Sequence, residues 1–147
     1  MLGEIFDPRR INMNLAGRTK NDVLGELVET VKVTDSALDR QELLNAIITR
    51  EEKMTTIILP GVAVPHGYCK TIHGIIGAIG FSRGGVEFDL EYRDPVHLLF
   101  LLLMDESSRE QHLRVLGRLL EMINSAALGE IRGIESPQEI YKLLCRY

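Results

Sequence analysis

The chain has 147 residues, 45% hydrophobic and 26% charged, a composition that fits one globular domain and excludes a disordered or fibrous chain. The net charge of −4 argues against a protein that neutralises many nucleic-acid phosphates, and the absence of Trp leaves little for base stacking. No signal peptide is evident, and the longest apolar run, 96–104, is far shorter than the ~20 residues of a membrane-spanning helix. We therefore expect a cytoplasmic protein without membrane insertion, in which Cys69 and Cys145 stay reduced.

The first third of the chain predicts a strand and two helices. Residues 11–15 alternate apolar and polar side chains, as a half-buried strand does. Thr19 or Asn21 can cap a helix that runs to about residue 31 with apolar positions at the helical period. A second helix is expected to follow Asp35-Ser36 and to end near 50–53. Its inner side is formed by Ala37, Leu38, Leu43, Leu44, Ile47 and Ile48.

The middle of the chain predicts a buried sheet. Residues 54–105 carry only three basic and five acidic side chains. Arg83-Gly84-Gly85 is a turn signal, and the alternating residues 86–90 predict an edge strand after it. The remaining short runs are rich in branched residues and punctuated by Gly and Pro, which is typical of strands buried on both faces: 57–59, 62–64, 75–81 and 97–104.

The last third predicts two helices. Ser136-Pro137-Gln138-Glu139 has the composition of a helix start with a capping box. A longer helix is expected over 107–125, with one side lined by Leu113, Leu116, Leu119, Leu120 and Ile123. Together the elements predict one α/β (α+β) domain over 1–147, in which helices flank a mixed parallel and antiparallel sheet of about five strands.

His66 lies in the most unusual segment, between Pro65 and Gly67 at the end of an apolar strand. Pro65 restricts the backbone, so the histidine leaves the sheet at a defined point. Gly67 removes side-chain bulk and lets another backbone or a partner approach the imidazole closely. An imidazole that is partly neutral at physiological pH can act as nucleophile, base or metal ligand, although a turn histidine without a role is nearly as common.

His112 raises the odds of a functional site. It shares one face of the 107–125 helix with the apolar residues 116, 119, 120 and 123, so its ring points at the sheet. A histidine at a strand end and another at a helix start can meet at one edge of a sheet, where open sheets place ligands. A single core histidine, by contrast, is more often just a hydrogen-bonding residue.

Arg50 and two threonines are further candidates. The planar guanidinium of Arg50 suits phosphate oxygens, but an arginine at a helix end is more often a solvated charge. Thr55 and Thr56 offer hydroxyl groups nearby, or serve only as turn and strand residues. No glycine-rich phosphate loop or nucleophile elbow is present.

A metal site is a less favoured alternative. His66, Cys69 and His73 carry ligand-type side chains, but their spacing matches no common zinc pattern. His97 lies inside an apolar run, and core packing is its expected role.

Several segments in a fixed order carry a resemblance that covers nearly the whole chain. They are Arg50-Glu51, Thr55-Thr56, Gly61-Val62-Ala63-Val64-Pro65-His66-Gly67, the run 94–103 that opens with Asp94-Pro95, His112-Leu113, and Ser136-Pro137-Gln138-Glu139-Ile140. This set resembles the fructose/mannitol/nitrogen-type enzyme IIA of the bacterial phosphoenolpyruvate phosphotransferase system.

The resemblance implies a phosphocarrier. By the family pattern, His66 accepts a phosphoryl group from the histidine phosphocarrier protein and passes it to a IIB domain or holds it as a regulatory signal. His112 and Arg50 match the supporting histidine and arginine, and Thr55, Thr56 and Gly67 lie where phosphoryl-binding support is expected. The implied fold is a mixed sheet flanked by helices, and no metal, nucleotide or other cofactor is implied.

Residues 57–60 (Ile-Ile-Leu-Pro) depart from the family pattern, which has a glycine-rich stretch there. The departure favours an alternative in which the domain no longer transfers phosphoryl groups and acts by binding a target. A third possibility is a small metal-binding protein that uses His66, Cys69 and His73.

Overall fold

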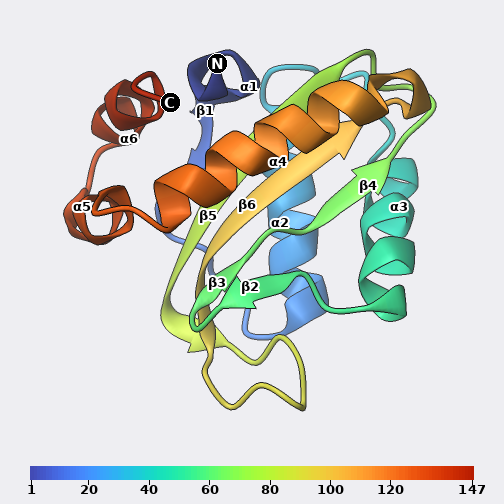
Figure 1. The fold of residues 1–147 in the computed structure, drawn as a ribbon. Coiled ribbons are helices and arrows are strands. Elements are labelled where there is room, and N and C mark those ends of the chain that lie inside the picture. The colour runs from blue at the N-terminus through green and yellow to red at the C-terminus, as the bar shows by residue number, and fades with distance from the viewer.

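A six-stranded mixed sheet forms the centre of the computed structural model, which describes residues 1–147. Five strands follow the order β1-β5-β6-β3-β2, and β4 pairs with β6 beyond the end of β3 (Figure 1). This architecture confirms the predicted mixed sheet. The strands are β1 (Phe6–Asn12), β2 (Ile57–Leu59), β3 (Val62–Ala63), β4 (His66–Tyr68), β5 (Ile75–Val86) and β6 (Val96–Met104).

Strand β6 is the centre of the sheet and has partners along both edges. On one edge β5 runs antiparallel to it. On the other edge β3 and then β4 run parallel to it, with Val62 opposite Leu98 and Gly67 opposite Leu103. Between these two short strands, the carbonyl of Pro65 accepts the Leu102 N–H at 3.0 Å. The chain from β3 to β4 therefore follows β6 almost continuously.

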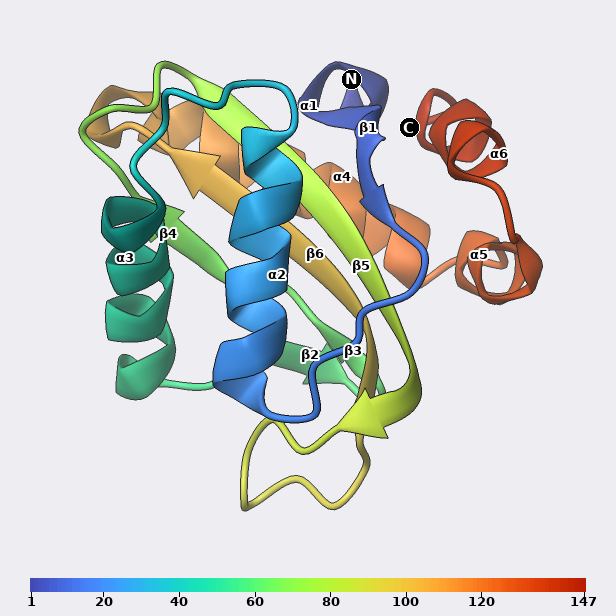
Figure 2. The same ribbon diagram turned by 180° about the vertical axis from the view of Figure 1, so that it is seen from behind.

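Helices cover both faces of the sheet. Helices α2 (Lys20–Lys32) and α3 (Arg40–Lys53) cover the face seen in Figure 2. The opposite face packs against α1 (Leu2–Ile5), α4 (Arg109–Ile123), α5 (Ala127–Gly133) and α6 (Pro137–Leu144). Two hydrophobic cores result, of 20 and 19 buried residues, so β6 is buried on both faces as its sequence predicts. None of the helices has the length and apolar character needed to cross a membrane.

Side-chain caps place the first two long helices. Thr19 caps α2: its hydroxyl accepts the Asp22 N–H at 3.2 Å, and the Asp22 carboxylate accepts the Thr19 N–H at 3.4 Å. This is a complete capping box. Asp39 caps α3, so this helix begins later than the predicted start after Asp35-Ser36, and Ala37 is exposed ahead of it rather than on its inner side.

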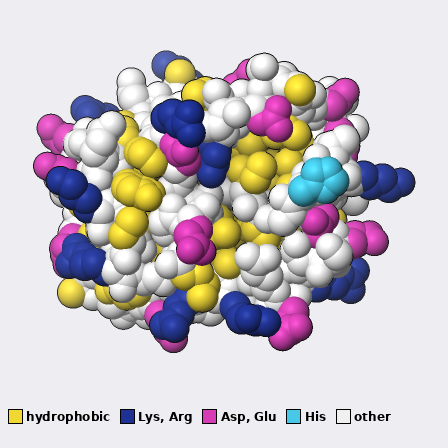
Figure 3. All heavy atoms as spheres, turned by 90° about the horizontal axis from the view of Figure 1, so that it is seen from above, with side chains coloured by type: hydrophobic (Ala, Val, Ile, Leu, Met, Phe, Trp, Pro, Cys, Tyr) yellow, Lys and Arg dark blue, Asp and Glu magenta, His cyan; other side chains and the backbone are white.

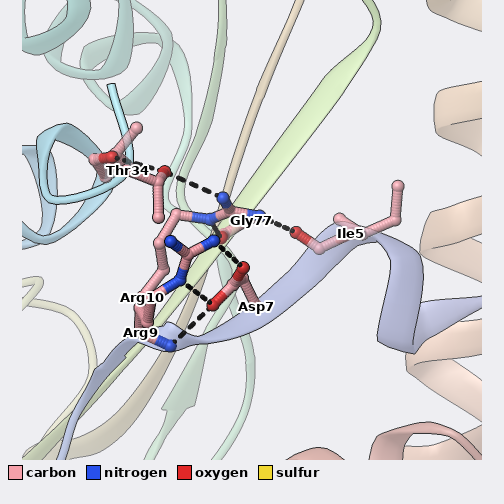
Figure 4. Close-up of polar contacts among 7 residues, drawn as sticks. Ile5, Asp7, Arg9, Arg10, Thr34 and Gly77 are labelled. Atoms are coloured by element: carbon pink, nitrogen blue, oxygen red, sulfur yellow. Dashed lines mark hydrogen bonds and ion pairs between the residues drawn. The ribbon is translucent and has the colours of Figure 1, made fainter. Parts of the chain in front are cut away.

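Arg10 ties the first strand to its surroundings (Figure 4). Its guanidinium donates to the carbonyls of Ile5 and Gly77 and to the hydroxyl of Thr34, each at 2.9 Å. Strand β1 thus covers 6–12 rather than the predicted 11–15. The pattern misplaced this strand because its first half carries the charged residues Asp7, Arg9 and Arg10, which interrupt the apolar alternation.

The predicted turn at 83–85 is wrong. Strand β5 continues through these residues to Val86, and its register with β6 shifts between Phe81 and Val86. Gly85 has a φ of 77°, so the glycines serve an irregularity within the strand instead of a chain reversal. No edge strand forms over 86–90, where only Glu87 makes an isolated bridge, to Thr19.

Several predicted side-chain positions also differ. Leu113 is 68% exposed, because the buried face of α4 is formed by residues 112, 115, 119, 122 and 123. His97 is exposed rather than packed in a core, and β2 is a partly exposed edge strand. Ser136 precedes α6 as predicted, but its hydroxyl donates to Gln138 at 3.2 Å and no capping box forms.

Gly67 sets how closely α3 approaches β4, and its replacement by Ala should destabilise the fold. A Cβ at this position would lie 2.9 Å from the carbonyl carbon of Ala46 and 3.0 Å from its oxygen, and backbone cannot yield as a side chain does. We expect Gly67→Ala to lower the free energy of unfolding by about 1–3 kcal/mol in urea titrations. Gly129→Ala is the matched control because no atom lies within 4 Å of its Cβ position. Equal stabilities of the two variants would contradict this account of the helix–strand contact.

Candidate functional site

His66 is the first residue of β4 and directly follows Pro65. Its ring Nδ1 lies 3.0 Å from the carbonyl oxygen of Val64. A carbonyl only accepts hydrogen bonds, so Nδ1 carries the proton. The lone pair of the neutral ring is therefore on Nε2.

His112 meets His66 above the sheet. Their ring centroids are 5.2 Å apart, with the planes tilted by 47°. The short 3₁₀ turn Glu106–Ser108 after β6 starts α4 over the same end of the sheet, which carries His112 back to β4. The ring of His112 is buried, and its Nε2 has no hydrogen-bond partner. The predicted meeting of the two histidines is confirmed.

Both rings are held toward their neutral forms. Burial lowers the pKa of His66 below its ordinary value of 6.5; the hydrogen bond to Val64 opposes this shift, and the charge of Arg50 adds to it. Burial also lowers the pKa of His112, and the neighbouring His66 contributes in the same direction. A neutral imidazole is the form that can act as a nucleophile.

Arg50 lies in the last turn of α3, half-buried, and its charge acts on His66. Its Nη1 donates to the carbonyl of Met54 at 2.8 Å. No carboxylate forms an ion pair with it within 4 Å. The guanidinium thus keeps donors available for an anion at the site.

Glu51, whose role the sequence does not predict, is a buried carboxylate behind the site. Its two oxygens accept the Thr56 N–H at 3.0 Å and the Thr56 hydroxyl at 2.6 Å. Lys20 Nζ lies 3.3 Å from Oε1, and the Glu51 side chain is only 2% exposed. Since the Thr56 hydroxyl is engaged here, Thr56 supports the site through its backbone. The Thr55 hydroxyl accepts the Ile57 N–H at 3.3 Å.

A chain of hydrogen bonds links this carboxylate to the His66 ring. Glu51 fixes Thr56, whose carbonyl accepts the Val64 N–H at 2.9 Å. The carbonyl of Val64 in turn accepts from His66 Nδ1. Glu51 is therefore a positioning residue for the imidazole. No single-residue pattern identifies it, because a glutamate at a helix end usually faces water.

Tyr68 and Arg109 form part of the rim of the site. Tyr68 is 38% exposed, and its ring lies edge-on to His112 with centroids 6.3 Å apart. The guanidinium of Arg109 stacks over Tyr68 at 5.3 Å. Neither residue was predicted from the sequence, although spacing is a signal that could have found them: Tyr68 is two residues after His66 on a strand, and Arg109 is three before His112 on a helix. Figure 3 shows the end of the molecule toward which β4 and β6 run, where hydrophobic side chains and a histidine lie among charges of both signs.

The alternative metal site is not assembled. No group of three or more His, Cys, Asp or Glu side chains is placed to hold a metal ion. Cys69 is buried, and burial raises the pKa of its thiol to about 11, which disfavours the thiolate that metals bind.

Removal of the buried carboxylate should destabilise the protein. In Glu51→Ala the buried Thr56 N–H and hydroxyl lose their acceptor, so we expect a loss of about 3 kcal/mol in the free energy of unfolding. The neighbouring Glu52 is exposed, and Glu52→Ala should change stability by no more than about 0.5 kcal/mol. Urea titrations of both variants check this. Similar losses in the free energy of unfolding would show that Glu51 contributes no more to stability than an exposed glutamate.

The lowered histidine pKa values predict an acid-sensitive fold. In the unfolded chain both rings titrate near 6.5, whereas in the folded chain they take up protons only at lower pH. As pH falls through 6.5 the unfolded state binds protons first, so the free energy of unfolding decreases. Urea titrations of the wild type and of a His66→Asn/His112→Asn double variant, at neutral and mildly acidic pH, should show a smaller decrease in the variant. The same decrease in both proteins would refute this assignment.

Comparison with known proteins identifies relatives of two kinds. The chain is 28% identical over 144 residues to a nitrogen regulatory protein of Pseudomonas aeruginosa, covering 97% of this chain and 94% of that protein. It is 29% identical over 120 residues to the fructose-specific EIIABC component of the Bacillus subtilis phosphotransferase system, covering 82% of this chain but only 19% of that protein.

Solved structures agree with this chain in fold. The nitrogen regulatory protein IIA-Ntr from Neisseria meningitidis superposes with a TM-score of 0.88 at 27% identity, covering 97% of this chain and 98% of that one. The mannitol enzyme IIA of Escherichia coli, solved in complex with phosphorylated enzyme IIB, gives a TM-score of 0.78 at 20% identity, covering 97% and 100%. The family model for the phosphoenolpyruvate-dependent sugar phosphotransferase system, EIIA 2, matches residues 4–147. With its paired histidines at the edge of the sheet and this match over nearly its full length, the chain belongs to the EIIA 2 family of the phosphotransferase system.

Proposed function

We propose that residues 1–147 form a phosphocarrier domain in which Nε2 of His66 accepts a phosphoryl group. The observation that carries this proposal is the 3.0 Å contact between His66 Nδ1 and the Val64 carbonyl, which leaves the Nε2 lone pair free. Burial supports it further, because a lowered pKa keeps the ring unprotonated at neutral pH. The membership of the EIIA 2 family gives the reaction class.

The proposed transfer exchanges one N–P bond for another. The bond between phosphorus and the donor's histidine nitrogen breaks, and its electron pair stays with the donor, while the Nε2 lone pair forms the new bond to phosphorus. His66 keeps its Nδ1 proton, so positive charge develops in the ring and the Val64 carbonyl stabilises it. Catalysis of this kind is mostly positioning and charge stabilisation, and the proposed step uses no cofactor.

His112 and Arg50 are the proposed supporting groups. The unpartnered Nε2 of His112 lies in the ring that packs against His66, where it can donate to a phosphoryl oxygen. The unpaired guanidinium of Arg50 can bind a second oxygen. Thr55 and Gly67 remain proposed contacts through a hydroxyl and through close backbone approach.

The proposed partners are the histidine phosphocarrier protein as donor and either a IIB domain or a regulatory target as acceptor. The mannitol relative in complex with IIB supports the first kind of acceptor, and the nitrogen regulatory relatives support the second. Identities of 29% and 28% to the two kinds of relative do not favour either branch. These partners belong to the cytoplasm, where we place the domain.

Phosphorylation of His66 is directly testable. Incubation with phosphoenolpyruvate, enzyme I and the histidine phosphocarrier protein should add one phosphoryl group to the intact mass, and acid should remove it. His66→Ala should show no added mass, and His73→Ala, which replaces an exposed histidine outside the site, should behave as wild type. A His66→Ala protein that is still phosphorylated would disprove the assignment, and an unmodified wild type would favour the binding-only alternative.

The same assay separates the nucleophile from its helper. His112→Ala should slow transfer by about 10²–10⁴-fold, as expected for loss of a positioned proton donor, yet reach the same final mass. His112→Gln retains an N–H donor and should lie between wild type and Ala. Equal rates in all three proteins would make His112 a packing residue only.

A further inference from the structure

A cavity lies on the α5 side of the sheet, near the beginning of β6. Its volume is about 320 Å³, at the small end of the range for ligand pockets. Side chains from β5, β6 and α5 line it: Phe81, Ser82, Arg83, His97, Leu98 and Arg132. It is far from His66, because His66 pairs with Leu102, and the five residue steps from His97 to Leu102 span roughly 17 Å of extended strand.

The two arginines of this cavity have no counter-ion. Neither Arg83 nor Arg132 forms an ion pair or a side-chain hydrogen bond, whereas five other arginines each pair with a carboxylate. No carboxylate lines the cavity. Arg132 lies against the turn between β2 and β3, since its Nη2 would be 3.6 Å from a Cβ built on Gly61. Two arginines from different elements, β5 and α5, therefore line one cavity without a negative partner.

His97 is held in a fixed orientation beside them. Its Nδ1 lies 2.8 Å from the Ser82 carbonyl and must donate to it. Its ring packs against Gly85, where a Cβ would come within 2.8 Å of Cε1 and 3.0 Å of Nε2. The irregularity in β5 thus has a structural effect: the glycine backbone makes room for the imidazole at the cavity wall.

We propose that this cavity binds a small organophosphate. Arg83 and Arg132 would bind the phosphate, because the planar guanidinium matches two phosphate oxygens at once. Phe81 and Leu98 supply an apolar surface for the organic part of the ligand. The site is separate from His66, which lies near the other end of β6.

Nuclear magnetic resonance of the full ¹⁵N-labelled chain tests the proposal with phenyl phosphate as the probe. Saturable shifts are expected at the amides of Phe81, Ser82 and Leu98. Arg83→Gln and Arg132→Gln should each weaken binding by about tenfold, as loss of a charged hydrogen bond does. Arg118→Gln is the matched control, because it removes the same charge from an exposed arginine on α4 that pairs with Glu121.

Three outcomes would overturn the proposal. The first is the absence of saturable shifts at the cavity, or shifts confined to Gly67 and Tyr68, which would place the probe at the His66 site. The second is equal affinity in all three arginine variants and the wild type. The third is equal affinity for inorganic phosphate and phenyl phosphate, which would leave the apolar wall without a role.

Discussion

The edge of β6 is the constraint on which the site depends. Two short strands share this edge, and Pro65 between them accepts a hydrogen bond from Leu102 without having an N–H of its own to place. Pairing with β6 is therefore broken only briefly between β3 and β4, and His66 is the first residue of β4. Helix α3 packs on one side through Gly67, and α4 brings His112 from the other. The geometry of both histidines is therefore set by rigid backbone elements rather than by loops.

The electrostatics of the site follow from how these elements bury it. Desolvation makes both imidazoles poor bases, while the carboxylate of Glu51, also buried, is stabilised by Thr56 and Lys20. This carboxylate orients His66 through a chain of hydrogen bonds, while its charge is the smallest of the effects on the pKa of that ring. The neutral imidazole of His66 and the negative charge of Glu51 can therefore exist in one site, because backbone groups lie between them in the chain of hydrogen bonds.

The sequence predicted the sheet class, the long helices and the histidine pair, since each rests on a sustained period or a local restriction such as Pro65. Leu113 was predicted to be buried but is exposed. Neighbouring positions on this helix give two plausible apolar stripes, and the one that packs against the sheet includes His112 and not Leu113. The turn predicted at 83–85 is wrong because glycines are common both in turns and at irregularities within strands. Glu51 was missed because its burial depends on Lys20 and Thr56, contacts that only the tertiary fold creates.

The contact between His66 and the Val64 carbonyl has a consequence for the proposed phosphorylated state. A carbonyl oxygen can only accept a hydrogen bond, so this contact favours the form of the ring that keeps the Nδ1 proton while phosphorus is bound at Nε2. Such a ring departs as neutral imidazole, which makes it a good leaving group. The hydrogen bond that directs acceptance of the group thus also favours its release, and transfer in either direction would be governed by which partner is docked.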